Sequence, residues 1–321
     1  MHLAVLSNER LNPWVNWTTL GPPLLRPLAA HENARLVAPP NLGLDNFRQW
    51  KNVWRDVRSS DTLFWMQSSS RPEKAVHLAS LARPGARRSA FVVDAWKYSA
   101  TKIGVLALLQ HLNPCFVAFR EGCEELKRRF PSGNFEWLPF GVDTEVFDSG
   151  PGERTIFAYW MGRRYEPLHQ AMLRYCSDRG LDYRYTQRGG EFPDPRELGK
   201  VVGSCQYFMV TPPNLSHPGR TGGFSPFVMR YLEGLAAGAR LLGVLPGSGE
   251  YTELLPLDAI LQVAPDGSDL AAKLDADRRN PNAAAAVEKA RTLVRSRHSW
   301  ARRAEQVFQR LSSGTATGFH T

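Results

Sequence analysis

The stretch "SPFVMRYLEGLAAGARLLG", residues 225–243, has the pattern of a helix that runs directly into a strand. Small and apolar residues fill 226–237, as in a buried helix, and "RLLGVL" (240–245) is a short apolar run typical of a buried parallel strand. Glu233 breaks this pattern by placing a carboxylate inside the apolar run. Burial of an unpaired charge is costly, so a carboxylate at this position indicates a specific role.

The same alternation of strand and helix patterns extends over the rest of the chain. Short apolar runs bounded by turn residues occur at 2–7, 34–40, 62–68, 89–96, 115–119 and 135–140, and again at 155–162, 205–213 and 259–264. Helical patterns occur at 71–82, 101–112, 121–130, 167–180, 194–204, 268–277, 281–295 and 299–311. Alternating elements of this kind predict an α/β fold with doubly wound parallel sheets.

A polar linker divides the chain into two domains. "FDSGPGER" (147–154) combines Gly, Pro and Asp, and the strand–helix pattern restarts after it. We therefore expect two Rossmann-like domains that face a cleft, the first over 1–148 and the second over 149–296. The tail 312–321 is expected to be disordered. Ligands of such sheets bind outside the carboxyl ends of the strands.

Bulk composition limits the location and the partners. The longest apolar runs, such as "IGVLALL" (103–109), are far shorter than the ~20 residues of a membrane span. The start of the chain lacks the pattern of a signal peptide. The four cysteines are scattered, as in reduced cytosolic thiols, without zinc-site spacing. We expect a cytoplasmic protein, and contact with a membrane surface stays open.

The chain is strongly basic. Its formal net charge is +9 and its pI is about 9.6. This balance favours an anionic partner, whether phosphate, nucleic acid or an acidic membrane surface. A coding bias toward arginine explains the excess equally well, because the arginines are dispersed along the chain.

Three segments resemble the retaining GT-B glycosyltransferases (family 4, or group 1). "WLPFGVDTEVF" (137–147) resembles the family's "PNGVDxxxF", residues 225–243 resemble "EGFGLxxLEAMAxGxPVV", and "HSWARRAEQVFQRL" (298–311) resembles its closing helix. The resemblance implies an acceptor domain over 1–148, a nucleotide-sugar domain over 149–296, and a last helix (297–311) that crosses back to the first domain. It also implies a retaining, metal-independent transfer that needs no cofactor.

The resemblance gives Glu233 a role. In the family, the second Glu of an E-x7-E pair binds the ribose hydroxyls of a nucleotide-sugar, and a carboxylate suits a vicinal diol because it accepts two hydrogen bonds. The alternative is a local cap or salt bridge. Eight residues upstream stands Ser225, where the family has the first Glu, which contacts the transferred sugar. This difference puts the usual sugar specificity in doubt.

Two glycine-containing loops are further candidates for the donor site. In "GRTGGFSPF" (219–227), Gly222, Gly223 and Phe224 precede the predicted helix, so backbone amides and the helix N-terminus can face a pyrophosphate. "PGSGEYTELLP" (246–256) resembles the family's "GGxxEL" loop and adds the candidates Gly247, Gly249 and Glu253, with Glu250 as a rival. The alternatives are a plain flexible loop and exposed carboxylates at a helix start.

Arginine and acidic residues complete the candidate site. Arg163 and Arg164 resemble the family's diphosphate-binding Arg, although the Lys that follows in the family is absent. A solvated surface pair is the alternative. Asp94 ends a predicted strand and resembles the family's D-x-W pattern, in which Trp96 stacks on a sugar or packs in the core. Glu121 follows another strand, and 20–25 is a candidate acceptor loop.

These observations favour a glycosyltransferase. Arg163 is the residue expected to stabilise the charge of the leaving diphosphate, and Asp94 is the first candidate for a general base if the reaction inverts configuration. The donor sugar, the base and the acceptor (small molecule, glycan or lipid-linked) stay open. The alternatives are a catalytically inactive GT-B-like binding protein, suggested by Ser225, and a nucleic-acid-binding protein, suggested by charge.

Overall fold

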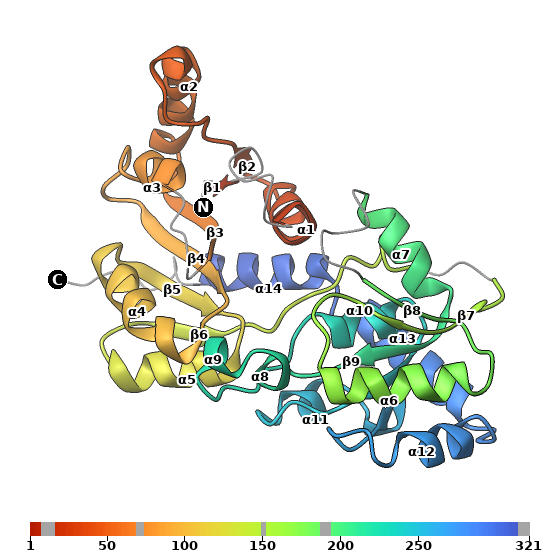
Figure 1. The fold of residues 1–321 in the computed structure, drawn as a ribbon. Helices are drawn as coiled ribbons and strands as arrows, with labels where there is room; N and C mark the ends of the chain where they lie inside the picture. The colour runs from red at the N-terminus through yellow and green to blue at the C-terminus, as the bar shows by residue number, and fades with distance from the viewer. Residues whose placement is uncertain (8–16, 69–73, 149–151, 187–193, 314–321) are drawn as a thin grey trace. The chain divides into compact units, whose positions relative to one another are not determined.

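The computed structural model describes residues 1–7, 17–68, 74–148, 152–186 and 194–313. The chain divides into two compact units, the first formed by Met1–Phe140 with Trp300–Thr321 and the second by Gly141–Ser299. Each unit contains one parallel β-sheet with helices packed on it (Figure 1). The predicted α/β class with two doubly wound domains is confirmed.

The first unit contains a six-stranded parallel sheet in the order β2-β1-β3-β4-β5-β6. Its strands are β1 (Leu3–Leu6), β2 (Ala34–Val37), β3 (Thr62–Ser68), β4 (Arg87–Val93), β5 (Leu112–Val117) and β6 (Phe135–Trp137). Strand β1 lies between β2 and β3, and all four of its residues are buried. Parallel strands covered on both faces are continuous apolar runs, which is why the sequence predicts them well.

The helices of the first unit cover both faces of the sheet. They are α1 (Trp17–Ala29), α2 (Phe47–Arg58), α3 (Lys74–Ser80), α4 (Ala100–Leu109), α5 (Arg120–Arg129) and α14 (Trp300–Ser313), with the 3-10 turns η1 (Leu44–Asn46) and η2 (Lys97–Ser99). The chain crosses from β1 to β2 in one direction and then from β2 through β6 in the other. Right-handed crossovers therefore place α1 on one face and α2 to α5 on the other.

Helix α1 corrects a sequence prediction. Residues 20–25, predicted as an acceptor loop, lie inside this helix, although the helix contains Pro22, Pro23 and Pro27. The side chains of Leu24, Leu25 and Leu28 are completely buried. Burial of three leucines outweighs the low helix propensity of the prolines.

Helix α14 belongs to the first unit, next to α1. The Phe140 carbonyl accepts a hydrogen bond from Arg303 Nε (3.2 Å), and the Glu136 carboxylate accepts hydrogen bonds from both Nε and Nη2 of Arg310. The Phe308 and His31 rings stack with centroids 4.0 Å apart. The predicted disordered tail is described only for Ser312 and Ser313, which end this helix, and 314–321 lie outside the described residues.

The second unit contains a five-stranded parallel sheet in the order β11-β10-β9-β7-β8. Its strands are β7 (Ile156–Trp160), β8 (Tyr183–Tyr185), β9 (Cys205–Val210), β10 (Arg240–Gly243) and β11 (Ile260–Gln262). Its helices are α6 (Glu166–Ser177), α7 (Pro195–Gly203), α8 (Pro213–Ser216), α9 (Pro218–Thr221), α10 (Arg230–Ala236), α11 (Glu250–Leu254), α12 (Leu270–Asp277) and α13 (Ala283–Arg297), with the 3-10 turn η3 (Leu257–Ala259). The first strand of this unit, β7, lies next to the edge strand β8, just as β1 lies next to the edge strand β2 in the first unit.

The second unit begins at Gly141, whereas the sequence pattern predicts a boundary after residue 148. Residues 141–148 contact the second unit at several points. Val142 forms a parallel bridge with Ser299, and the Thr144 carbonyl accepts a hydrogen bond from Arg295 Nη1 (3.0 Å). A Cβ on Gly199 in α7 would lie 1.8 Å from the Val146 carbonyl oxygen, so a glycine is required at this close approach.

Candidate functional site

The loops after β7, β9 and β10 carry most of the predicted site residues of the second unit. Because the strands are parallel, their carboxyl ends lie at one edge of the sheet, where ligands of open α/β sheets bind. The loops comprise 161–165, 211–229 and 244–249. The structure therefore brings Arg163, Arg164, Gly222, Gly223, Phe224, Ser225, Gly247 and Gly249 to this edge.

Glu233 lies on α10 with a buried carboxylate. Its side chain is 6% exposed, and Oε2 has no hydrogen-bond partner among the described residues. Burial raises the pKa of Glu233 to about 7, and the charge of Arg230 partly opposes this shift. A buried acceptor without a partner is costly in the folded protein. A hydrogen-bond donor from a ligand would remove this cost.

Arg230 was missed in the sequence analysis. It lies at the start of α10, and its Nη1 donates hydrogen bonds to the carbonyls of Met161 (3.2 Å) and Arg163 (3.4 Å) in the loop after β7. Arg230 therefore fixes that loop against α10 and also places a positive charge near Glu233. The sequence alone could have indicated this proximity, because residues three apart on a helix are neighbours and Arg230 lies three residues before Glu233.

Helix α10 begins at Arg230, so the predicted helix start at 226 is wrong. Residues 224–228 are non-helical, and the Phe227 N–H donates to Glu250 Oε2 (2.8 Å). The predicted helix N-terminus directly behind Gly222 and Gly223 is therefore absent. Both glycines have positive φ, +64° and +93°, which confirms that this turn favours glycine.

Ser225 and Glu250 join two loops of the site. The Ser225 hydroxyl oxygen accepts a hydrogen bond from the Gly247 N–H (2.8 Å). Glu250 is completely buried, and its Oε2 accepts hydrogen bonds from the Phe227 N–H and from the Ser248 hydroxyl (2.7 Å). These contacts hold 224–228 and 246–250 together. We call this pair of loops, 224–228 and 246–250, the clamped loops.

The Glu250 carboxylate joins the two clamped loops through its hydrogen bonds to Phe227 and Ser248. Glu253 lies further along α11 and its side chain is exposed. The rival considered in the sequence analysis is therefore the better candidate. Gly249 has φ +74° and precedes the first residue of α11, which explains why a glycine stands before Glu250.

Arg163 and Arg164 differ in their surroundings. The Arg164 guanidinium donates to the Thr186 carbonyl (2.6 Å) and lies 4.4 Å from the centre of the Tyr185 ring, so it is held by the end of β8. The Arg163 side chain is exposed, and among the described residues its guanidinium has no ion-pair partner. Its backbone is fixed, because the Arg163 carbonyl accepts a hydrogen bond from Trp160 Nε1 (3.1 Å).

The segment after β9 contains further polar groups that were not among the site residues predicted from the sequence. Three buried side-chain atoms here have no partner among the described residues: Thr211 Oγ1, Asn214 Oδ1 and His217 Nδ1. Burial lowers the pKa of His217, and the charges of Arg163, Arg220 and Arg230 lower it further. A cationic neighbourhood with unpaired polar atoms suits an anionic ligand that is rich in hydroxyl groups. The polar run "TPPNLSHPGRTGG" (211–223) directly after a strand was the available signal.

Asp94 and Glu121 follow β4 and β5 in the first unit, at the carboxyl edge of that sheet. Asp94 has φ +55°, which is uncommon for a residue other than glycine and occurs at functional sites. A Cβ on Gly122 would lie 2.4 Å from the Ala95 carbonyl oxygen, so the start of α5 packs tightly on the Asp94 loop. Trp96 is 7% exposed and packs on the Phe119 ring, with centroids 4.6 Å apart. Trp96 is therefore a core residue.

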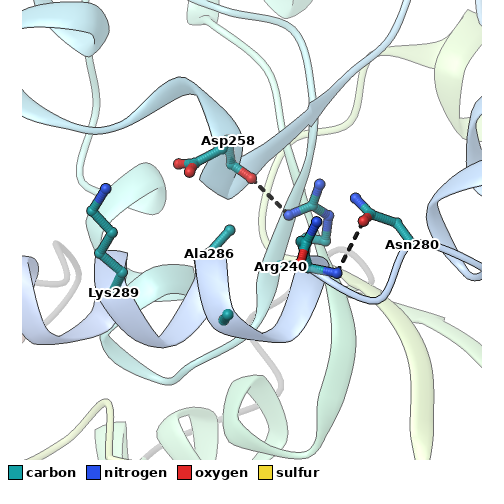
Figure 2. A pocket seen from close by; sticks show the side chains of 7 residues that line it. Arg240, Asp258, Asn280, Ala286 and Lys289 are labelled. Atoms are coloured by element: carbon teal, nitrogen blue, oxygen red, sulfur yellow. Dashed lines mark hydrogen bonds between the residues drawn. The ribbon is translucent and has the colours of Figure 1, made fainter.

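A hollow of about 410 Å³ lies at the opposite, amino edge of the second sheet. Arg240, Asp258 and Lys289 line it, and none of the predicted site residues does. Figure 2 shows the Arg240 side chain turned toward Asp258, whose carbonyl accepts its hydrogen bond (2.8 Å). Arg240 also forms an ion pair with Asp277 (2.7 Å). We attribute a structural role to this arginine.

Within the described ranges, no cluster of three or more His, Cys, Asp or Glu side chains has the geometry of a metal site. The four cysteines are buried and form no disulfide, and burial raises the pKa of Cys123 and of Cys176 to about 11. None of the helices in these ranges combines the length and the apolar character that crossing a bilayer requires.

The segment that contains nearly all residues of these second-unit loops matches a known family model. Residues 163–309, 147 of the 321 residues, match the family model described as "Glycosyl transferase-like". The match covers slightly less than half of the chain. It contains every donor-site candidate named above, from Arg163 to Glu253. No curated protein sequence matches the chain.

Solved structures show the same fold. Anabaena Alr3699/HepE in complex with UDP and glucose is 12% identical with a TM-score of 0.60, over 98% of this chain and 100% of that chain. The same protein in complex with UDP-glucose is 12% identical with a TM-score of 0.61, over 97% and 99%. A structure of accessory secretory proteins 1, 2 and 3 of Streptococcus pneumoniae is 9% identical with a TM-score of 0.56, over 84% and 58%. The chain therefore has the GT-B fold, as the resemblance predicted.

Proposed function

We propose that this protein is a glycosyltransferase that takes a sugar from a nucleotide-sugar donor bound at the carboxyl edge of the second sheet. One observation carries the proposal. Glu233 has a buried carboxylate oxygen without a partner, inside the segment that matches the glycosyl transferase-like family. A ribose diol offers the two hydroxyl donors that this carboxylate can accept.

The arrangement of the donor site suggests that the arginines and the clamped loops have different roles. Arg163, with the nearby charges of Arg220 and Arg230, offsets the negative charge of the diphosphate as it leaves. The clamped loops fix the backbone that faces the donor, because Ser225 and Glu250 hold them through hydrogen bonds. Preorganised groups of this kind accelerate transfer by positioning and by charge stabilisation. We assign the acceptor to the carboxyl edge of the first sheet, near Asp94 and Glu121.

The first experiment is a thermal-shift screen with nucleoside diphosphates and nucleotide-sugars. A ligand that binds only the folded state raises the melting temperature. UDP and UDP-glucose are the first compounds to test, because the structures of Alr3699/HepE contain UDP with glucose or UDP-glucose. A shift followed by sugar transfer or donor hydrolysis supports the proposal. A shift without any turnover indicates an inactive binding protein, and the absence of a shift with every nucleotide contradicts the proposal.

The donor site should be sensitive to pH near neutrality. The pKa of Glu233 is raised to about 7 in the free protein, and hydrogen bonds from a diol would lower it in the complex. Below pH 7 a proton must leave before the diol binds, so nucleotide affinity should fall about tenfold from pH 8 to pH 6. Calorimetric titration at both pH values measures this change. The Glu233→Gln variant should lose the pH dependence, and an unchanged dependence in that variant contradicts the assignment.

We infer a retaining, metal-independent reaction from the sequence resemblance and the arginines near His217. Activity should then survive EDTA, and NMR of the product should show the anomeric configuration of the donor. An inverted product would require a general base, for which Asp94 is the first candidate. Activity that disappears with EDTA and returns with added Mg²⁺ or Mn²⁺ would mean that a metal ion, and not arginine alone, holds the diphosphate.

A further inference from the structure

Helix α4 is apolar on two faces. Ala100, Ile103, Gly104 and Ala107 are buried against the first unit, as expected for its inner face. The outer face also carries aliphatic side chains, since Val105 is 43%, Leu108 36% and Leu109 72% exposed. A surface helix normally has polar residues on the outer side, and a helix that is apolar all round is usually covered. The outer face of α4 therefore calls for a covering partner.

The neighbouring helix α3 extends this apolar surface. Leu78, in the last turn of α3, is 38% exposed, and Leu81, directly after the helix, is 64% exposed. His77 Nδ1 and Gln110 Nε2 form a hydrogen bond of 2.9 Å, which joins the end of α3 to the end of α4. The helices follow β3 and β4 on one face of the sheet (Figure 1). Leu78, Leu81, Val105, Leu108 and Leu109 together form what we call the leucine patch.

The patch lies in a stretch of the chain that is almost free of acidic residues. Between Glu73 and Glu121 the only acidic residue is Asp94, whereas the basic residues are Lys74, Arg83, Arg87, Arg88, Lys97, Lys102 and Arg120. Lys97 and Lys102 are exposed, in η2 and on α4 respectively. Lys102 lies three residues before Val105 and seven before Leu109 on α4, so this lysine shares the helix face of those two aliphatic side chains.

We propose that the leucine patch docks this protein on the surface of an anionic membrane. Leucine side chains enter the boundary between headgroups and acyl chains, and lysines bind anionic headgroups, so one surface satisfies both features. A second copy of the chain would satisfy the leucines but would place lysines against lysines. This inference does not rest on the proposed transfer reaction.

Vesicle flotation tests the proposal. The wild-type protein should float with vesicles that contain phosphatidylglycerol and should bind pure phosphatidylcholine vesicles more weakly. The double variant Leu81→Glu/Leu109→Glu should bind at least about tenfold more weakly, because two apolar contacts are lost and two negative charges are added. Leu257→Glu is the matched control, since Leu257 is 54% exposed but lies in η3 of the second unit. It should bind like the wild type.

The lysine contribution and the competing occupant are measured separately. Lys97→Glu/Lys102→Glu should reduce binding to anionic vesicles by an order of magnitude or more while leaving binding to phosphatidylcholine unchanged. Thermal melts should show that these substitutions of exposed residues leave the fold intact. Wild-type protein that stays with the soluble fraction, or a leucine double variant that floats as well as wild type, overturns the proposal. Light scattering that shows a wild-type dimer dissociated by Leu81→Glu/Leu109→Glu, without vesicle binding, assigns the patch to a second copy instead.

Discussion

Glu233→Ala is expected to weaken nucleotide binding by about 2 kcal/mol or more, roughly thirtyfold, which is the scale of hydrogen bonds to a charged group. The wild-type carboxylate is buried with one oxygen unpaired, so its replacement removes an unfavourable group from the free protein. Above pH 7 the variant should therefore bind nucleotide more weakly without a comparable loss of stability. Calorimetric titration and thermal melts measure the two effects.

This combination separates a ligand-binding role from a structural one. A Glu233 that only caps or pairs locally would give lower stability in Glu233→Ala and unchanged affinity in the folded fraction. Glu253→Ala is the matched control, because Glu253 is an exposed carboxylate in the same unit. It should change neither property. Unchanged nucleotide affinity in well-folded Glu233→Ala would refute the ribose assignment.

The sequence was sufficient for most strands of the two sheets, because buried parallel strands are continuous apolar runs. The edge strand β8, which is only partly buried, was not among the predicted strands. The run 240–245 contains β10, and the predicted strand 89–96 contains β4. Helices α1 and α2 were missed. The prolines of α1 conceal its helical pattern, and α2 has many charged residues around the buried side chains Trp50, Val53 and Val57. The spacing of those three residues was the signal available for α2.

Only part of the candidate site could be predicted, because some of the contacts that form it join residues far apart in the sequence. Glu233 stands out in the sequence because its neighbours are apolar, and it is buried as this pattern suggests. The choice between Glu250 and Glu253 depends on a hydrogen bond across 23 residues, from the Phe227 N–H to Glu250. Local patterns contain no information on such a contact. The boundary after Phe140 likewise depends on the bridge between Val142 and Ser299.

Arg163→Ala is expected to lower kcat/KM by about 100-fold, the effect of removing one preorganised group that stabilises developing charge. The backbone of Arg163 is fixed by Trp160 Nε1 and by Arg230 Nη1, while its guanidinium has no ion-pair partner among the described residues. A cation on a fixed backbone and without an ion-pair partner can bind the leaving diphosphate without breaking another ion pair. Arg164 differs, because its guanidinium is engaged by the Thr186 carbonyl and the Tyr185 ring.

Arg164→Ala is therefore the matched comparison. Loss of its contacts should lower the melting temperature, because the end of β8 loses its guanidinium partner, while the turnover of the folded enzyme changes little. Arg163→Ala should show the reverse, with nearly unchanged stability and low turnover, since the substituted side chain is exposed. Steady-state kinetics corrected for the folded fraction separate the two. Full activity in Arg163→Ala with an inactive Arg164→Ala would transfer the phosphate role to Arg164, and full activity in both would remove this arginine pair from the mechanism.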